Sequence, residues 1–482
     1  MRIRPTARGT AAALVAAASL VAVAGPASAA PGDPGSRRFT DGSTSGGDPY
    51  FPAAGNGGYD VQHYGLDLSW AADGRLDGTA VVPLTATADL ASFSLDLRGL
   101  TVSSVRVDGK PARYTQLPPG EDGRGGELVV QTAPKLRAGT THEVTVVYGG
   151  YPGQPTDAEG ALYGWVTFPD GVLVANEPEG APTWFPVNDV PTDKATYDFR
   201  ITVPEGKTAI ANGEPVGEPT TAGGRTTFLW RATDPMASYL ATASIGDYTA
   251  TTGLGPDDLP ILDFVETGVT GDALATTRAS LALQPAMIDF FDDVLGPYPF
   301  TSFGSIVDDD SVEYALETQT RPVYSQVASE TTVAHELAHQ WVGNSVSPAT
   351  WADVWLNEGF ATYAQWMWTA TRPGGATEQE QFDEVYATPA EDEFWSVVVA
   401  DPGREGIFAA AVYDRGAAAL HALRTEIGDA AFRDLLRRWV TENADSTVTT
   451  ADFVALAEQV SDRDLDALFT DWLYTPARPA GY

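Results

Sequence analysis

The chain has no cysteine, only five histidines among its 482 residues, and, after its first 29 residues, no long apolar run. Without cysteine it forms no disulfide, so its stability must come from core packing, with bound metal as a further source. No later stretch reaches the ~20 apolar residues that a membrane-spanning helix needs. Basic residues are also scarce, with 29 Lys and Arg against 65 Asp and Glu. The formal net charge of −36 excludes nucleic acid as a partner and indicates a solvated, self-repelling surface.

The first 29 residues have the composition of a secretory signal peptide. Three arginines precede an apolar run rich in alanine and valine, and Ala27, Ser28 and Ala29 supply the small residues typical of a cleavage site. The apolar run is too short and too rich in alanine for a good membrane span. We therefore expect residues 1–29 to be removed on export and the mature chain to be a secreted, soluble monomer that does not associate with membranes.

The pattern changes twice along the rest of the chain. Residues 30–58 are rich in glycine, serine and proline, which predicts a flexible, loosely attached leader. From residue 59 onwards, apolar and polar residues alternate in short runs, such as 64–70, 79–85 and 144–146, which turn residues separate. Alternation of this kind is typical of strands with one buried face. The region 59–248 is therefore predicted to be an N-terminal antiparallel β domain.

Beyond about residue 260 the apolar residues recur with helical spacing. We expect a mostly helical second domain over 249–482, which makes the fold class α+β with more than one domain, in keeping with the length of the chain. The predicted helices cover 274–294, 332–344, 355–368, 409–426, 430–441 and 451–459.

Two histidines of the second domain stand four residues apart, His335 and His339, with Glu336 between them. Residues at this spacing are neighbours on one face of a helix, and zinc takes neutral imidazole nitrogens as ligands. Glu336 would then act as general base on a water molecule that the metal acidifies. Because the pattern is short, a chance occurrence on a solvated helix face is the alternative.

A third ligand is available in Glu358, nineteen positions after His339, where the next predicted helix begins. Three protein ligands and one position for water define a catalytic zinc site, whereas a closed structural site takes four ligands, usually thiolates. The absence of cysteine therefore favours a catalytic Zn²⁺ on His335, His339 and Glu358, and the chemistry is that of peptide-bond hydrolysis.

The zinc ligands and the Gly-Phe-Ala sequence at 359–361 resemble the aminopeptidase N family of zinc metallopeptidases. The resemblance extends from about residue 48 to the end of the chain, and it implies a β domain followed by a thermolysin-like catalytic domain. Residues 314–318 lie where the family has its Gly-Ala-Met-Glu-Asn exopeptidase motif, although only Ala315 and Glu317 are identical to it.

The same resemblance implies further site residues. Ala315 and Glu317 would contact the substrate, and Glu177 resembles the family's second amine-binding residue. Two carboxylates aimed at one point beside zinc would bind a free ammonium group. Tyr413 lies in a segment that resembles the one with the family's catalytic tyrosine, and its phenol would stabilise the tetrahedral oxyanion. Since Glu177 comes from the β half, the site should lie at the domain interface.

The sequence therefore predicts a secreted zinc aminopeptidase that hydrolyses N-terminal residues from peptides with a free N-terminus by means of zinc-activated water. One alternative is a thermolysin-like zinc endopeptidase, in which the upstream carboxylates are only structural. Another is an exported binding protein that has kept the fold and lost turnover. Cleavage of N-terminally blocked peptides would favour the first alternative, and zinc occupancy without cleavage would favour the second.

Overall fold

The computed structural model describes residues 38–120, 124–157 and 160–481. The predicted signal peptide, residues 1–29, and the first part of the predicted leader, 30–37, lie outside the described residues. Within the described ranges, no helix combines the length and the apolar composition that crossing a membrane requires.

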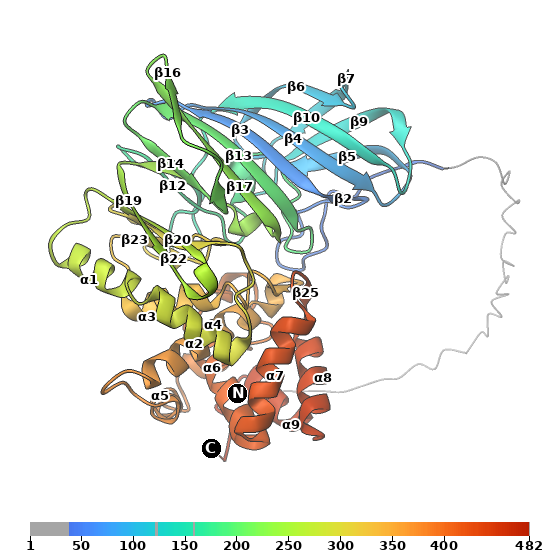
Figure 1. The fold of residues 1–482 in the computed structure, drawn as a ribbon. Coiled ribbons are helices and arrows are strands. Elements are labelled where there is room, and N and C mark those ends of the chain that lie inside the picture. Colours follow the sequence, from blue (N-terminus) through green and yellow to red (C-terminus); the bar gives the residue numbers. More distant parts are fainter. Residues whose placement is uncertain (1–37, 121–123, 158–159, 482) are drawn as a thin grey trace, which may run out of the picture. The chain divides into compact units, whose positions relative to one another are not determined.

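The first half of the chain is built mainly of strands, shown in blue to green in Figure 1. Its largest sheet has ten strands: β2 (Tyr59–Val61), β3 (His63–Trp70), β4 (Leu76–Ala86), β6 (Thr101–Val107), β7 (Lys110–Pro111), β10 (Thr141–Gly150), β13 (Ala195–Pro204), β15 (Glu214–Pro215), β16 (Thr220–Ala222) and β17 (Arg225–Met236). The main strand order is β15-β17-β13-β3-β4-β10-β6-β7, with β2 beside β4 and β16 beside β17. Every second side chain of β4 is buried, because one face of the sheet packs on the core.

Two four-stranded sheets complete this β domain. One consists of β1 (Thr40–Asp41), β5 (Leu90–Asp96), β9 (Glu127–Leu136) and β8 (Arg113–Leu117), and the other of β11 (Gly164–Thr167), β12 (Val172–Ala175), β18 (Ala243–Gly246) and β14 (Thr208–Ala211). The predicted N-terminal β domain is confirmed, although two of its strand pairs, β13 with β3 and β1 with β5, are parallel. Parallel neighbours need a long connection, and more than a hundred residues separate β3 from β13.

The second half begins with a sheet that the sequence analysis did not predict. Its strands are β19 (Tyr248–Leu254), β20 (Pro260–Glu266), β21 (Phe303–Asp308), β23 (Val323–Ser325) and β22 (Ala315–Leu316), in that spatial order. All six residues of β21 are buried. A strand that is buried on both faces shows no alternation of apolar and polar residues, so its period could not be recognised in the sequence.

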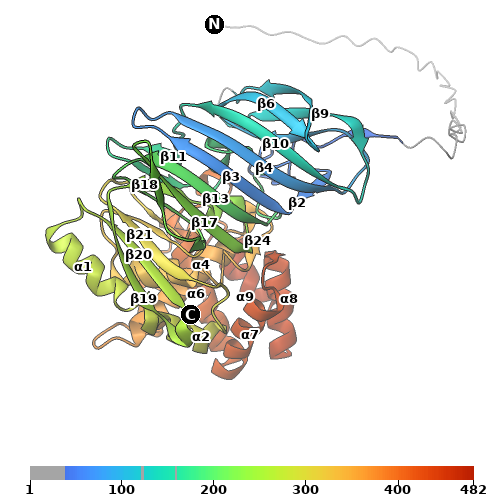
Figure 2. The same cartoon turned by 45° about the horizontal axis from the view of Figure 1, so that its top comes forward.

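Helices make up most of the remaining chain: α1 (Gly271–Leu281), α2 (Gln284–Leu295), α3 (Glu330–Ala338), α4 (Trp355–Ala370), α5 (Glu378–Tyr386), α6 (Ala410–Ile427), α7 (Asp429–Glu442), α8 (Thr450–Ser461) and α9 (Asp466–Phe469). Figure 2 shows α7 and α8 side by side, on the side away from the ten-stranded sheet. The single helix predicted over 274–294 is wrong, because the first helix ends at Leu281 and a new helix begins at Gln284, with Pro285 in its first turn. The helix predicted over 332–344 is shorter in the structure, where α3 runs from Glu330 to Ala338.

Residues 39–58 differ from the predicted loosely attached leader, because they pack against both halves of the structure. The Asp48 carboxylate accepts hydrogen bonds from the backbone N–H groups of Tyr50 and Phe51 and, through its other oxygen, from Trp351 N at 2.8 Å. The ring of Phe51 meets that of Trp351 edge to face at 6.3 Å. This segment therefore joins the β domain to the helical half.

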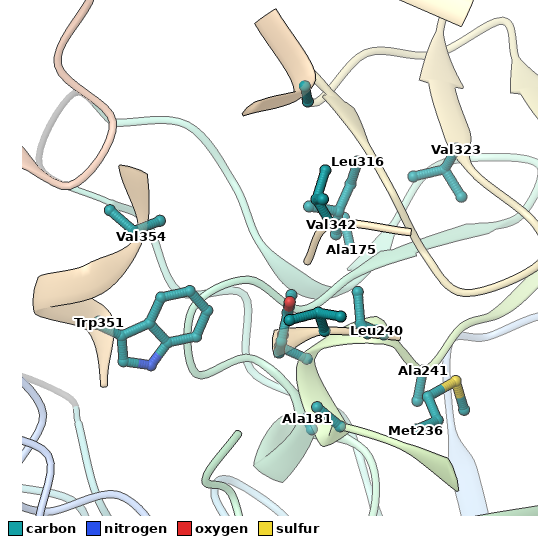
Figure 3. Packing of buried hydrophobic residues seen from close by; sticks show 14 of the residues in the cluster. Ala175, Ala181, Met236, Leu240, Ala241, Leu316, Val323, Val342, Trp351 and Val354 are labelled. Atoms are coloured by element: carbon teal, nitrogen blue, oxygen red, sulfur yellow. The ribbon is translucent and has the colours of Figure 1, made fainter. Parts of the chain in front are cut away.

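The hydrophobic core is continuous between the two halves. Figure 3 shows residues of the β domain, among them Ala175 and Leu240, close to Leu316 and Val342 of the second half. All four are at most 3% exposed. Because apolar burial fixes the two halves against each other, side chains that project from both of them can be held in one geometry.

Candidate active site

The helix α3 contains His335 and ends at Ala338, so that His339 is its C-cap residue. Its first turn is capped by Ser329, whose hydroxyl accepts a hydrogen bond from Thr332 N. The Nδ1 atom of His339 lies 3.1 Å from the carbonyl oxygen of Val342, just beyond the helix. A hydrogen bond from Nδ1–H to this carbonyl leaves Nε2 with a free lone pair, which is the tautomer that a metal ligand requires.

The helix α4 supplies Glu358 and packs closely against α6, which carries Tyr413. The two helices meet at a pair of glycines. A Cβ atom placed on Gly416 would lie 3.0 Å from the Cα atom of Gly359, so the backbones can approach this closely only without side chains. The pair sets the position of Glu358, next to Gly359, relative to Tyr413, one turn before Gly416.

Three donor atoms converge between α3 and α4. The Nε2 atoms of His335 and His339 are 3.1 Å apart, and Oε2 of Glu358 lies 3.3 Å from the first and 3.4 Å from the second. Tetrahedral zinc with ligands at about 2.0–2.1 Å separates its donor atoms by about 3.3 Å. The three predicted ligands therefore fit zinc in both chemistry and spacing.

Four carboxylates surround this point, and three of them are not zinc donors: Glu177, Glu317 and Glu336. A carboxylate oxygen of Glu317 lies within 4.8 Å of ligand atoms of Glu336 and His339. Carboxylate oxygens of Glu177, Glu317 and Glu358 also lie within 4.8 Å of one another. Glu177 follows β12 of the β domain, so the structure places a residue from each half at one point. The predicted location between the two halves is thus what the structure shows.

Two of these carboxylates have oxygens without a hydrogen-bond partner. Glu177 is 7% exposed and Glu317 is 2% exposed, and Oε1 of each has no partner among the described residues. The backbone carbonyl of Glu317 accepts hydrogen bonds from the side chains of Gln340 and Asn344, which follow α3. These bonds fix the backbone of Glu317 beside the metal site.

The buried carboxylates of the site would be stabilised by nearby positive charge. Burial raises the pKa of Glu317 to about 7, and burial followed by the charges of its carboxylate neighbours raises the pKa of Glu177 well above its usual range. Burial likewise raises the pKa of Glu336. Among the described residues that line the cavity, none is lysine or arginine. Positive charge from a metal and a substrate would relieve this repulsion.

Tyr413 lines the cavity beside His335. Its ring is stacked near that of His335, with centroids 6.1 Å apart and planes 23° apart. Burial, and then the charge of Glu358, raise the pKa of its phenol, so the hydroxyl keeps its proton and stays a donor. The neighbouring Arg415 is buried, and its guanidinium donates hydrogen bonds to five backbone carbonyls: those of Trp395, Val397, Asp471, Trp472 and Thr475.

All the predicted site residues line one cavity of about 510 Å³. Ala315 belongs to its wall, in β22, where it pairs with Tyr324 of β23. Tyr314 and Leu316 of the predicted exopeptidase segment also line the cavity. The sequence analysis missed the remaining lining residues, which belong to no recognised motif: Asp157, Ala161, Tyr163, Glu313, Thr332 and Phe408.

Two family models match the chain. The peptidase M1 N-terminal domain matches residues 60–240, and the peptidase family M1 domain matches residues 306–472. Among curated relatives, aminopeptidase M1-C of Oryza sativa subsp. japonica is 27% identical over 60% of this chain and 35% of its own length. A leukotriene A-4 hydrolase homolog of Botryotinia fuckeliana is 27% identical over 84% of this chain and 67% of its own.

The chain thus spans about a third of the length of the first plant relatives that it matches, 35% to 36%. A solved M1 zinc metallopeptidase from Deinococcus radiodurans is similar over its whole length. It has a TM-score of 0.81 and 29% identity, and the match covers 91% of this chain and 100% of that one.

Proposed function

The chain belongs to peptidase family M1, and we propose that it is a zinc aminopeptidase that removes N-terminal residues from peptides. The observation that carries this proposal is the pair of buried, unpartnered oxygens on Glu177 and Glu317 beside the three metal donors. The similar metallopeptidase from Deinococcus radiodurans has been solved with a Tyr-Ser-Ala substrate, which supports a peptide as the ligand of this cavity.

His335, His339 and Glu358 would hold the zinc ion, which when bound acts as a Lewis acid that polarises the scissile carbonyl and lowers the pKa of water. Glu336 would accept the proton of the attacking water and pass it to the leaving amine. A carboxylate oxygen of Glu336 lies within 4.8 Å of ligand atoms of Glu317 and His339. From this position beside the metal site, Glu336 would take part in both proton transfers.

Glu177 and Glu317 would bind the ammonium group of the substrate. A free N-terminus has a pKa of about 8, so most of it is charged at neutral pH. Its N–H groups would satisfy the two unpartnered carboxylate oxygens, which otherwise remain desolvated. An internal peptide nitrogen carries no charge and would leave them unsatisfied, which is why the site favours exopeptidase over endopeptidase activity.

Tyr413 would donate its phenolic hydrogen bond to the oxygen that becomes negative as water adds to the carbonyl. A neutral donor is suited to this position, because it adds no charge to the ground state. The protonated state that burial gives Tyr413 supports this role.

We further propose that the enzyme is secreted and acts as a monomer. The composition of residues 1–29 supports export, and the strongly acidic composition is compatible with solubility outside the cell.

The test compares free-amine aminoacyl amides with their N-acetylated counterparts, for the natural sequence and for Glu177→Gln and Glu317→Gln. Chelator-sensitive hydrolysis confined to free amines is expected, with kcat/KM about 10–100-fold lower in each variant. Equal hydrolysis of acetylated substrates would instead support an endopeptidase. Bound zinc without any hydrolysis would support a binding protein.

A further inference from the structure

We propose that the cavity selects peptides whose first residue has a cationic side chain, lysine or arginine, an inference that rests on the aminopeptidase function proposed above. Six carboxylates line the cavity: Asp157, Glu177, Glu313, Glu317, Glu336 and Glu358. Four of them have roles in metal binding, proton transfer or amine binding. Asp157 and Glu313 have none, and they remain available to the substrate side chain.

The position of these two residues follows from the direction of the bound peptide. The side chain of the first residue leaves the carbon next to the ammonium group, so it lies beside Glu177 and Glu317. Thr332 and His335 come from α3, Glu358 from α4 and Tyr413 from α6. Residues 313–316 and Asp157, which belongs to the β domain, line the same cavity and bind no metal in the proposed mechanism.

Tyr314 lines the cavity together with Glu177 and Asp157. Burial raises the pKa of its phenol, and the charges of Glu177 and Asp157 raise it further. The hydroxyl donates a hydrogen bond to the carbonyl of Leu162 at 2.8 Å. The phenol is thereby fixed in the wall of the cavity.

The chemistry of this wall suits a long side chain with a charged end. Tyr163, Ala161 and Leu316 offer apolar surface to methylene groups. Asp157 is half-buried and Glu313 is exposed, so their charges meet the end of such a side chain where water still reaches it. The Asp157 carboxylate accepts a hydrogen bond from Ala161 N at 2.7 Å, which holds it in place.

Two arginines outside the cavity lining lie close to Glu179. The guanidinium of Arg98 is also 6.0 Å from the ring centroid of Tyr163. Arg98 is 3.6 Å and Arg124 is 3.3 Å from the carboxylate of Glu179. The described lining of the cavity itself contains no lysine or arginine.

The experiment uses pairs of substrates of similar length in which one member lacks the side-chain charge, arginine against citrulline and lysine against norleucine, as aminoacyl amides with free amines. For the natural sequence, kcat/KM should favour the charged member of each pair about tenfold, and added salt should reduce the ratio. In a double variant, Asp157→Asn with Glu313→Gln, the ratio should fall towards one. Because the readout is a ratio, a general loss of activity cancels. Glu218→Gln, an exposed carboxylate far along the chain, is the matched control and should leave the ratio unchanged.

A ratio near one in the natural sequence, or a ratio that the double variant does not lower, would overturn the inference while leaving the aminopeptidase proposal intact. If no free-amine substrate is hydrolysed, the aminopeptidase proposal fails instead. Calorimetric binding of argininamide against citrullinamide then decides the charge preference independently: about tenfold tighter binding of argininamide supports it, and equal binding overturns it.

Discussion

Glu336 is the side chain whose replacement should separate chemistry from metal binding. It follows His335 on α3 but supplies none of the three converging donor atoms. Glutamine has the same shape as glutamate and cannot accept a proton at neutral pH.

We therefore expect Glu336→Gln to lower kcat about 10²–10⁴-fold, because general base catalysis is lost while the zinc ligands remain. Zinc content by mass spectrometry should stay at one per chain. Glu330→Gln is the control, since Glu330 is on the same helix but pairs with Arg372, and it should keep its activity. Near-normal turnover in Glu336→Gln would exclude Glu336 as the base.

A second carboxyl group should make stability depend on pH. Glu127 of β9 lies opposite Asp96 of β5 in the sheet register, and both are buried. Burial raises the pKa of Glu127 to about 8, compared with about 4.3 when exposed. The folded state thus favours the protonated form, so the contribution to stability is complete below about pH 4 and is lost as the pH rises through about 8.

The free energy of unfolding of the natural sequence should fall between about pH 6 and pH 9, because Glu127 ionises. In Glu127→Gln this side chain cannot ionise, so we expect the fall to be smaller by about 1–3 kcal/mol. Denaturant unfolding at both pH values measures the difference. Glu143→Gln removes an exposed carboxylate from β10 and should follow the natural sequence. Parallel pH profiles for Glu127→Gln and the natural chain would contradict the assignment.

At the level of elements, the contact between α4 and α6 decides how Glu358 faces Tyr413. Gly359 and Gly416 let the two helices touch through their backbones. Alanine in the middle of a helix gains about 1 kcal/mol in intrinsic propensity over glycine, whereas overpacking of a close contact costs about 1–3 kcal/mol. The two effects have opposite signs, so the outcome shows how rigid the contact is.

We expect Gly416→Ala to lower the free energy of unfolding by about 1–2 kcal/mol and to lower kcat, because the helices must separate and Tyr413 moves away from the metal site. Thermal unfolding and steady-state kinetics measure both effects. Gly253→Ala in β19, where an added Cβ meets nothing within 4 Å, serves as the control. A more stable and fully active Gly416→Ala would mean that the contact yields easily.

The elements also show how far the sequence could predict the structure. His335, His339 and Glu358 converge as predicted, because helical spacing is a local property that a sequence displays directly. Glu177 reaches the same point from another domain, and only family resemblance pointed to it. Strand β21 stayed unrecognised because it is buried on both faces, and α1 and α2 were merged although Pro285 marked the start of the second. Packing between distant segments leaves no period in the sequence.

For the whole molecule, zinc should act as a source of stability as well as of chemistry. A ligand that binds only the folded state, present at about a thousand times its dissociation constant, adds about 4 kcal/mol. The chain contains no cysteine, so disulfides cannot take over this role.

We expect removal of the metal by a chelator to lower the melting temperature by about 5 °C, reversibly on addition of zinc. Differential scanning calorimetry measures the shift. His335→Ala lacks one donor, so its melting temperature should respond little to the chelator. An unchanged melting temperature after verified loss of zinc from the natural sequence would show that the site is folded without help from the metal.

The buried guanidinium of Arg415 connects α6 to two distant segments of the chain. Arg415 is two residues from Tyr413. The backbone carbonyls that accept its hydrogen bonds belong to residues 395–397 and 471–475. Three of these acceptors follow Arg415 by 56 to 60 residues, so loosening of residues 471–475 would leave a buried charge without most of its acceptors on the helix that carries Tyr413, and would disturb the cleft from outside it.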